Sequence, residues 1–289
     1  MNNISSFFKT YKKELTTIFL FFIATRIIFA LMLNIGYYYL PKGYDVYDNV
    51  HKPLDIIFQF NDISNFLYIA QNGYNGSLYA FAPLYPVMIK LLSPIFFGSY
   101  EWAAFTISNI SFIIVILLLF YYLIEYIGKT ASMYATIALI IYPASHYNSV
   151  PYSEALYFLE AQKTWSRETP SPLIIPFIIK LFIRIFQYPA LRTTLEFLCP
   201  ITMLIFSILS VKKMPIYFSF YSIFTVIMPL TTNSTWSLTR LPMVALAAYA
   251  FIGIKSEKSK VFRIIWFLIS LTLFVIFTST MGQLRATFI

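Results

Sequence analysis

Long apolar runs alternate with short polar segments along the 289 residues, and this alternation predicts the architecture. A helix needs about 20 apolar residues to cross the hydrocarbon core of a membrane. We expect seven spans, at 14–38, 103–127, 131–148, 194–211, 215–231, 238–254 and 262–282. The fold class expected is therefore all-α, a polytopic membrane protein forming a single integral membrane domain over residues 1–289.

Two segments depart from this pattern. The polar loop 39–102 contains residues 83–97, PLYPVMIKLLSPIFF, whose three prolines and short length predict a re-entrant or interfacial helix. Residues 173–188 place Lys180, Arg184 and Tyr188 four positions apart, so that one helix face is basic and aromatic while the rest is apolar. This pattern is typical of a helix in the membrane interface. Its cations either anchor the helix to lipid phosphates or help to hold the phosphate of a lipid-borne substrate.

The distribution of lysine and arginine predicts the orientation, because cytoplasmic loops carry an excess of both. With seven alternating spans, one side receives Lys9, Lys12, Lys13, Lys129, Lys212, Lys213 and the basic cluster at 255–263. We therefore expect a cytoplasmic N-terminus and an extracytoplasmic loop 39–102. The membrane expected is the plasma membrane of a prokaryote or the endoplasmic reticulum of a eukaryote.

Composition supports a membrane protein, with 59% hydrophobic and 11% charged residues. The net charge of +9 is spread over small groups between apolar runs, which favours membrane lipids over nucleic acid as the partner. The single cysteine, Cys199, and two histidines give neither a disulfide framework nor an obvious metal site. We expect no cofactor and no metal.

The polar loop 39–102 is predicted to lie on the outer face of the membrane, and this location limits the possible chemistry. A site there has no access to cytosolic nucleotide sugars, and the chain has no Walker or dinucleotide-binding motif. A sugar linked to a polyprenyl phosphate would be delivered by the membrane itself. Its transfer to a hydroxyl needs a carboxylate base, for which Asp62 is a candidate, and a cation for the departing phosphate, for which Arg240 is a candidate.

Several motifs resemble those of one enzyme family. The run from Asp62 to Tyr74, DISNFLYIAQNGY, with AFAPLYP at 80–86, resembles the first signature of GPI mannosyltransferase 2 (PIG-V) and its prokaryotic relatives. These are multispanning enzymes of the GT-C architecture, a helical bundle with an extracytoplasmic first loop. YPAS at 142–145 with YSEAL at 152–156, the QxxWxR pattern at 162–167, and the S-x-x-R pattern ending at Arg240 are similar to later elements of that family.

The resemblance implies an inverting glycosyltransferase, of EC 2.4.1 type, that uses dolichyl- or other polyprenyl-phosphate mannose. The acceptor would be a hydroxyl of a glycolipid or glycan. Asp62 and Glu154 are then the catalytic carboxylates. The donor phosphate would be bound by Arg240, Lys180, Arg184 and Arg167. The substrates would contact Asn65, Tyr74, Tyr85, Tyr152, Gln162 and Trp165.

Two departures from the family pattern leave alternatives open. Asn61 stands where the family has tryptophan, and the junction at Leu159 and Glu160 joins elements that family members separate by several helices. Such a chain could also be a non-catalytic membrane subunit or a degenerate remnant, or a transporter of a lipid-linked precursor. Asp62 could merely cap a helix, and the tyrosines could belong to the aromatic belt. Arg26, within the first apolar run, is expected to pair with an acid in the bundle.

Overall fold

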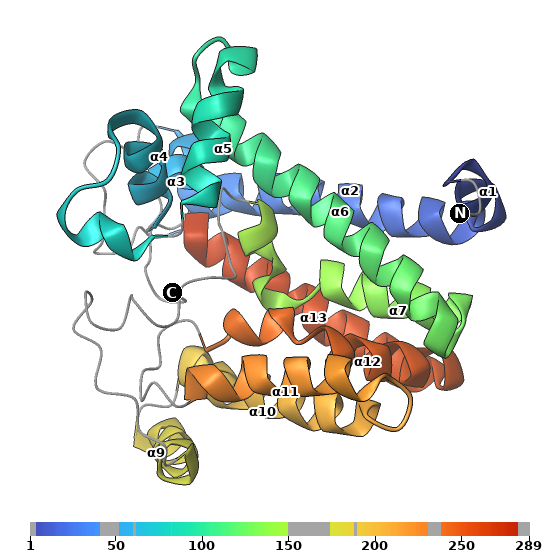
Figure 1. Cartoon of the computed structure of the whole chain (residues 1–289). Coiled ribbons are helices and arrows are strands. Elements are labelled where there is room, and N and C mark those ends of the chain that lie inside the picture. The colour runs from blue at the N-terminus through green and yellow to red at the C-terminus, as the bar shows by residue number, and fades with distance from the viewer. Residues whose placement is uncertain are drawn as a thin grey trace.

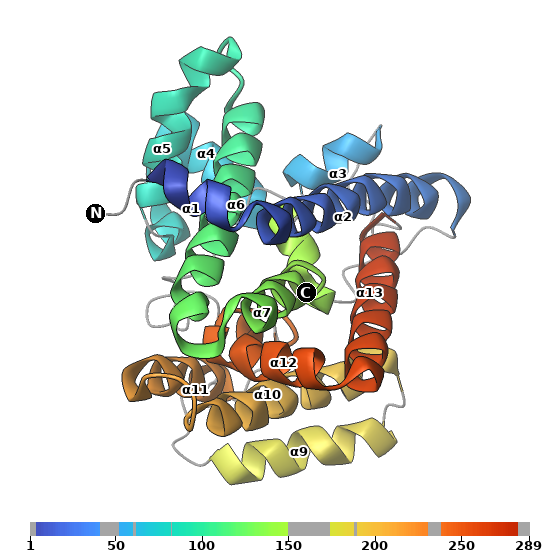
Figure 2. The ribbon, with the colours of Figure 1, turned by 90° about the vertical axis from the view of Figure 1, so that its right-hand side faces the viewer.

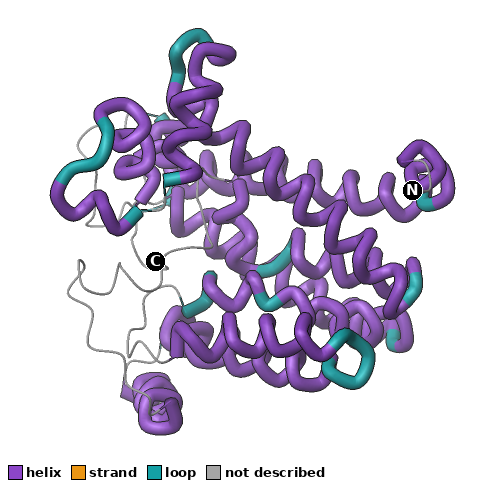
Figure 3. The backbone as a smooth tube through the Cα atoms, in the orientation of Figure 1, coloured by secondary structure: helices purple, strands orange, loops and turns teal. Residues whose placement is uncertain are grey.

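The computed structural model describes residues 4–40, 52–59, 62–81, 83–149, 174–187, 190–230 and 238–282. Within these ranges every regular element is a helix, and none is a strand. Figure 3 shows the helices as a purple tube joined by short loops. The prediction of an all-α fold is confirmed for this part of the chain.

The described ranges contain sixteen helical elements. The first eight are α1 (Ile4–Thr10), α2 (Lys12–Tyr39), α3 (Pro53–Gln59), α4 (Asp62–Asn72), η1 (Gly76–Ala80), α5 (Leu84–Leu92), η2 (Ser93–Phe96) and α6 (Tyr100–Ile127). The others are α7 (Lys129–Ile140), η3 (Pro143–Ser149), α9 (Ile174–Gln187), α10 (Leu191–Ser210), α11 (Ile216–Leu230), η4 (Leu241–Val244), α12 (Leu246–Lys258) and α13 (Lys260–Gly282). The η elements are short 3₁₀ helices.

In the described part of the chain, four helices are long and apolar enough to cross a membrane: Lys12–Tyr39, Tyr100–Ile127, Thr193–Ser210 and Lys260–Met281. They coincide with four of the predicted spans. Large apolar side chains remain exposed along them, including Phe19, Leu20, Leu118 and Ile265. Lipid is the solvent that suits such a surface, because water would leave a large apolar area uncovered. The chain is therefore a helical membrane protein.

The other three predicted spans contain shorter helices, because turns interrupt the apolar runs. α7, α11 and α12 have 12, 15 and 13 residues. Gly128, with φ +76°, immediately precedes α7, and the 3₁₀ helix η3 begins at Pro143, soon after α7 ends. At about 1.5 Å per residue these helices are shorter than the hydrocarbon core is thick. The total of seven spans and the cytoplasmic N-terminus stay predictions.

The interior of the bundle is built around α12. Figure 2 shows α12 between α7 and α10, and both neighbours contact it. Small residues permit the closest of these contacts. A Cβ atom on Gly253 would collide with the carbonyl oxygen of Ala131 and would lie 2.8 Å from the Cβ of Ala135. α2 packs against α13 beside this core.

The described part of the predicted loop 39–102 contains three short α-helices. α3, α4 and α5 gather near the Tyr100 end of α6, at the upper left of Figure 1. α4 contacts α3, α5 and α6. α5 and η2 cover most of the segment 83–97 that the prolines marked, while its re-entrant or interfacial placement stays a prediction. The candidate base therefore belongs to a folded helical unit.

The predicted interfacial segment 173–188 corresponds to α9, which covers 174–187. Figure 1 shows α9 end-on, and Figure 2 shows it lengthwise below α10. It touches the bundle through Leu181, which packs in a small cluster with Leu230 and Leu238. Most of α9 therefore lies on the periphery of the molecule.

Candidate functional site

Asp62 begins α4, and its side chain is nearly buried, with 9% exposure. The sequence makes this helix amphipathic, because Ile63, Phe66 and Ala70 recur at helical spacing and are almost fully buried. A carboxylate in the first turn of a helix is stabilised by the free backbone N–H groups and the positive end of the helix dipole. Asn65, half-buried, lies one turn further along the same face. The structure thus brings Asp62 and Asn65 together.

The segment after α4 turns back sharply at Gly73, whose φ of +85° suits glycine. The hydroxyl of Tyr74 donates a hydrogen bond of 2.9 Å to the carbonyl oxygen of Phe81. Its ring stacks on Tyr79 with centroids 5.6 Å apart. Burial raises the pKa of Tyr74, which favours the neutral phenol that this hydrogen bond requires. Tyr74 thereby closes the turn between α4 and α5.

Tyr85 on α5 joins three helices. Its hydroxyl donates a 3.0 Å hydrogen bond to the carbonyl oxygen of Ala104 and lies 2.7 Å from Ser108 Oγ, which then donates to it. Its ring meets Phe66 of α4 edge-on, with centroids 5.1 Å apart. Burial raises the pKa of the Tyr85 hydroxyl, and the hydrogen bond with Ser108 opposes this in part. Tyr85, which is 8% exposed, is thus an internal support for the group of helices α3, α4 and α5, which we call the Asp62 unit.

Arg240 lies in the turn before η4, and its guanidinium carbon is 5.0 Å from the ring centroid of Tyr147 in η3. The same turn is fastened to the end of α7, because the hydroxyl of Tyr142 donates a 3.0 Å hydrogen bond to the carbonyl oxygen of Thr239. His146, with 2% exposure, packs beside Tyr147 at a centroid distance of 4.3 Å. The Arg240 guanidinium thus lies against the ring of Tyr147. Tyr147 belongs to η3, which precedes the predicted site residues at 152–156 in the sequence.

The helices around Asp62 and the residues around Arg240, which include Tyr147 and His146, both pack against α6. α4 and η3 both contact α6, which runs from the end near α4 toward α7. The remaining predicted site residues, Glu154, Arg167, Tyr152, Gln162 and Trp165, lie outside the described residues, as does the junction at Leu159 and Glu160. Within the described residues, no group of three His, Cys, Asp or Glu side chains could hold a metal ion.

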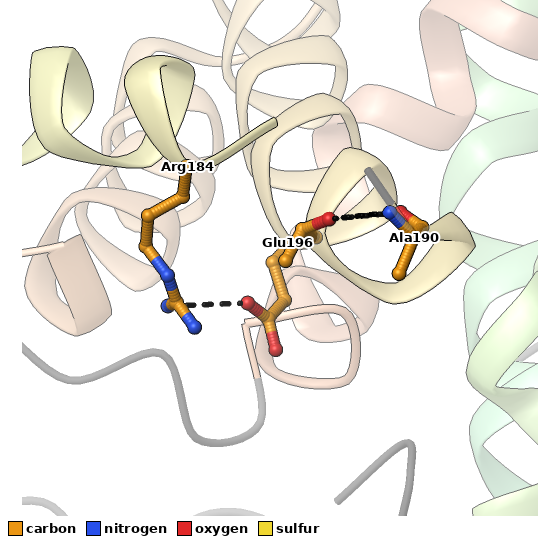
Figure 4. A network of polar contacts seen from close by, with 4 residues as sticks. Arg184, Ala190 and Glu196 are labelled. Atoms are coloured by element: carbon orange, nitrogen blue, oxygen red, sulfur yellow. Dashed lines mark hydrogen bonds and ion pairs between the residues drawn. The ribbon is translucent and has the colours of Figure 1, made fainter. Parts of the chain in front are cut away.

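Lys180 and Arg184 both lie on α9, but they have different surroundings. Arg184 Nη1 is 3.6 Å from Glu196 Oε2 of α10, and the Glu196 side chain has only 4% exposure. Figure 4 shows Arg184 pointing from α9 to Glu196, with Ala190 at the start of α10. There the Ala190 N–H donates to Thr193 Oγ1 at 3.3 Å. Lys180 is exposed, so only Lys180 of the two faces the surroundings of the protein freely.

An apolar groove between α2, α3 and α6 was not foreseen from the sequence. It has a volume of about 430 Å³, and its lining includes Phe22, Arg26, Leu54, Phe58, Trp102 and Asn109. Arg26 Nε donates a 3.0 Å hydrogen bond to Asn109 Oδ1. Its guanidinium carbon lies 4.5 Å from the Phe22 ring centroid. The described contacts of Arg26 are thus an amide and aromatic rings, while its predicted pairing with an acid stays a prediction.

Arg26, within the first apolar run, was the only feature of the sequence that indicated this groove. Its hydrogen-bond partner Asn109 lies on α6, 83 positions further along the chain, so the sequence did not show that the two residues meet. The described features are therefore a nearly buried carboxylate, a cation on an aromatic ring, and an apolar groove. Comparison with known proteins gives no match: no family model, no curated protein and no solved structure matches the chain.

Proposed function

We propose that the chain is a membrane glycosyltransferase that moves a mannose from a polyprenyl- or dolichyl-phosphate donor to a hydroxyl of a glycolipid or glycan acceptor. The observation that carries the proposal is the placement of Asp62. It lies nearly buried at the start of α4, in a unit that Tyr74 and Tyr85 hold rigid. A general base must be held in a fixed position, and this packing supplies that support.

The reaction needs one proton transfer and one displacement. Asp62 takes the proton of the acceptor hydroxyl, and the oxygen attacks the anomeric carbon of the donor sugar. The bond between that carbon and the phosphate oxygen breaks, with inversion at the anomeric centre. The polyprenyl phosphate leaves with the negative charge, which a guanidinium stabilises.

Arg240 is the described residue best suited to the departing phosphate. Tyr147 holds its guanidinium in place, and arginine keeps its charge at any physiological pH. Arg184 is engaged by Glu196, so the proposal gives it no part in phosphate binding. Glu154 and Arg167 keep the roles that the family resemblance implies.

The groove supports a lipid-linked donor. Leu54, Ile57 and Phe58 of α3 lie in its wall, and Asp62 follows Phe58 by four positions. Four residues span at most about 14 Å, so the backbone of Asp62 lies within this distance of Phe58 in the wall of the groove. Ligand sites are typically apolar clefts with a few polar groups, which is the character of this groove.

The test is transfer of labelled mannose from synthetic polyprenyl-phosphate mannose in membranes that contain the chain, with a membrane glycolipid extract as acceptor. Asp62→Asn keeps the size of the side chain and removes the base, so we expect transfer to fall by roughly 10²- to 10⁴-fold. Asp55→Asn is the matched control. Asp55 Oδ2 accepts a 2.8 Å hydrogen bond from the Lys52 N–H, and an amide oxygen preserves that bond.

Equal transfer by the Asp62→Asn variant and the unsubstituted chain would rule out Asp62 as the base. Absence of transfer by the folded, inserted chain would favour the non-catalytic subunit.

A further inference from the structure

The most exposed and the buried apolar side chains of α9 lie on different faces of the helix. Ile175, Ile179, Phe182 and Phe186 are each at least 49% exposed, and their spacing of four, three and four residues aligns them in one stripe. Leu181, on another face, is 2% exposed and packs with the bundle. The described part of the chain therefore leaves the apolar stripe uncovered.

The length and direction of α9 indicate what covers this stripe. With 14 residues the helix is about 21 Å long, which is too short to cross a core of about 30 Å. In Figure 1 α9, viewed end-on, lies near the left-hand ends of α10 and α11, and α10 contains the candidate span Thr193–Ser210. A short helix beside the end of a membrane span would lie near the membrane interface.

The charges of α9 fit the same placement. Glu196 lies three residues inside the candidate span and is 3% exposed, so Arg184 meets its carboxylate just below the end of that span. The pair would thus hold α9 near the depth where acyl chains meet headgroups. Lys180 is exposed on a different face from the apolar stripe, as expected for a cation that meets lipid phosphates while the stripe meets acyl chains.

We propose that α9 is seated in the interface of an anionic bilayer. Its stripe of Ile175, Ile179, Phe182 and Phe186 lies among acyl chains, Lys180 binds lipid phosphate, and the Arg184–Glu196 pair fastens the helix to α10. The proposal concerns anchoring and does not depend on the glycosyltransferase activity.

The test uses the full chain in nanodiscs that contain phosphatidylglycerol, with Cys199→Ala and single spin-labelled cysteines at successive positions from 175 to 187. Collision with oxygen, which concentrates in lipid, is compared with collision with a water-soluble nickel chelate. We expect oxygen access to peak at 175, 179, 182 and 186 with the helical period and with no trend along the axis. Labels at exposed positions of α2, such as 20, 27 and 31, serve as the control, because a crossing helix changes depth along its axis.

Three results would overturn the proposal. A steady change in oxygen access from 175 to 187 would mean that α9 crosses the bilayer at a steep tilt. Access of the nickel chelate to the stripe would place it in water. Protection of the stripe from both reagents would mean that a protein surface covers it.

Lys180 is tested separately with brominated lipids that quench a bimane dye attached at position 183, one turn from the lysine. One lysine at an anionic surface contributes about 1 kcal/mol, so phosphatidylglycerol should be preferred over phosphatidylcholine about fivefold. Lys180→Gln should remove this preference, while Lys212→Gln, in the turn after α10, should keep it. Retention of the preference in Lys180→Gln would refute the assignment of Lys180.

Discussion

The ion pair between Arg184 and Glu196 leads to a quantitative prediction about how α9 is held. We consider Arg184→Ala, which removes the cation and leaves the carboxylate in an almost buried position. At the 3.6 Å between Nη1 and Oε2, Coulomb's law with an effective dielectric constant of about 20 gives roughly 5 kcal/mol. The free energy of the pair must be smaller, because the Arg184 side chain keeps 31% exposure and both groups lose hydration.

We therefore expect Arg184→Ala to lower the free energy of unfolding by about 2 kcal/mol, between the values typical of exposed and of buried pairs. Glu196→Gln should cost less, because it removes the buried charge together with the attraction. The variant with both substitutions should be no less stable than Arg184→Ala. The two single effects are then not additive, and the departure from additivity, which is the coupling energy of the pair, should be about 1 to 2 kcal/mol.

The measurement is reversible unfolding in mixed micelles of a mild detergent and sodium dodecyl sulfate, followed by helical circular dichroism for all four proteins of the cycle. Lys180→Ala is the matched control, because it removes an exposed cation from the same helix and should change stability by less than about 0.5 kcal/mol. A coupling energy below about 0.5 kcal/mol would refute the pair as a fastening of α9.

Three further outcomes are expected. Tyr85→Phe removes the hydroxyl that joins α5 to α6 and leaves Ser108 without this partner, so the free energy of unfolding in the same assay should fall by about 1 to 2 kcal/mol. An unchanged midpoint would contradict the support assigned to Tyr85. Gly253→Ala should lower the free energy of unfolding by about 1 to 3 kcal/mol or prevent folding, because the new Cβ meets the backbone carbonyl of Ala131. Near-normal stability would show that α7 and α12 lie further apart than in the structure. Arg240→Lys should raise the KM for the polyprenyl-phosphate donor about tenfold with the fold intact, because lysine cannot bind phosphate through two nitrogens. An unchanged KM would show that Arg240 does not bind the donor phosphate.

The sequence alone determined the parts of the fold that depend on local hydrophobicity. Lipid requires long apolar helices, so four of the seven predicted runs, including 14–38 and 103–127, correspond to candidate spans. The amphipathic segment 173–188 was also readable, because its spacing of apolar and basic residues requires no knowledge of neighbours. Asp62 was identifiable as a candidate because a carboxylate beside apolar runs is costly unless it serves a purpose.

Tertiary contacts decided the rest, because they join residues that are distant in sequence. Which of two similar cations on α9 is held depends on Glu196, which belongs to another helix. The hydroxyl of Tyr85 could have faced a substrate or the interior, and the position of α6 placed it in the interior. The groove beside Arg26 exists only where α2, α3 and α6 meet, so no periodicity in one segment encodes it.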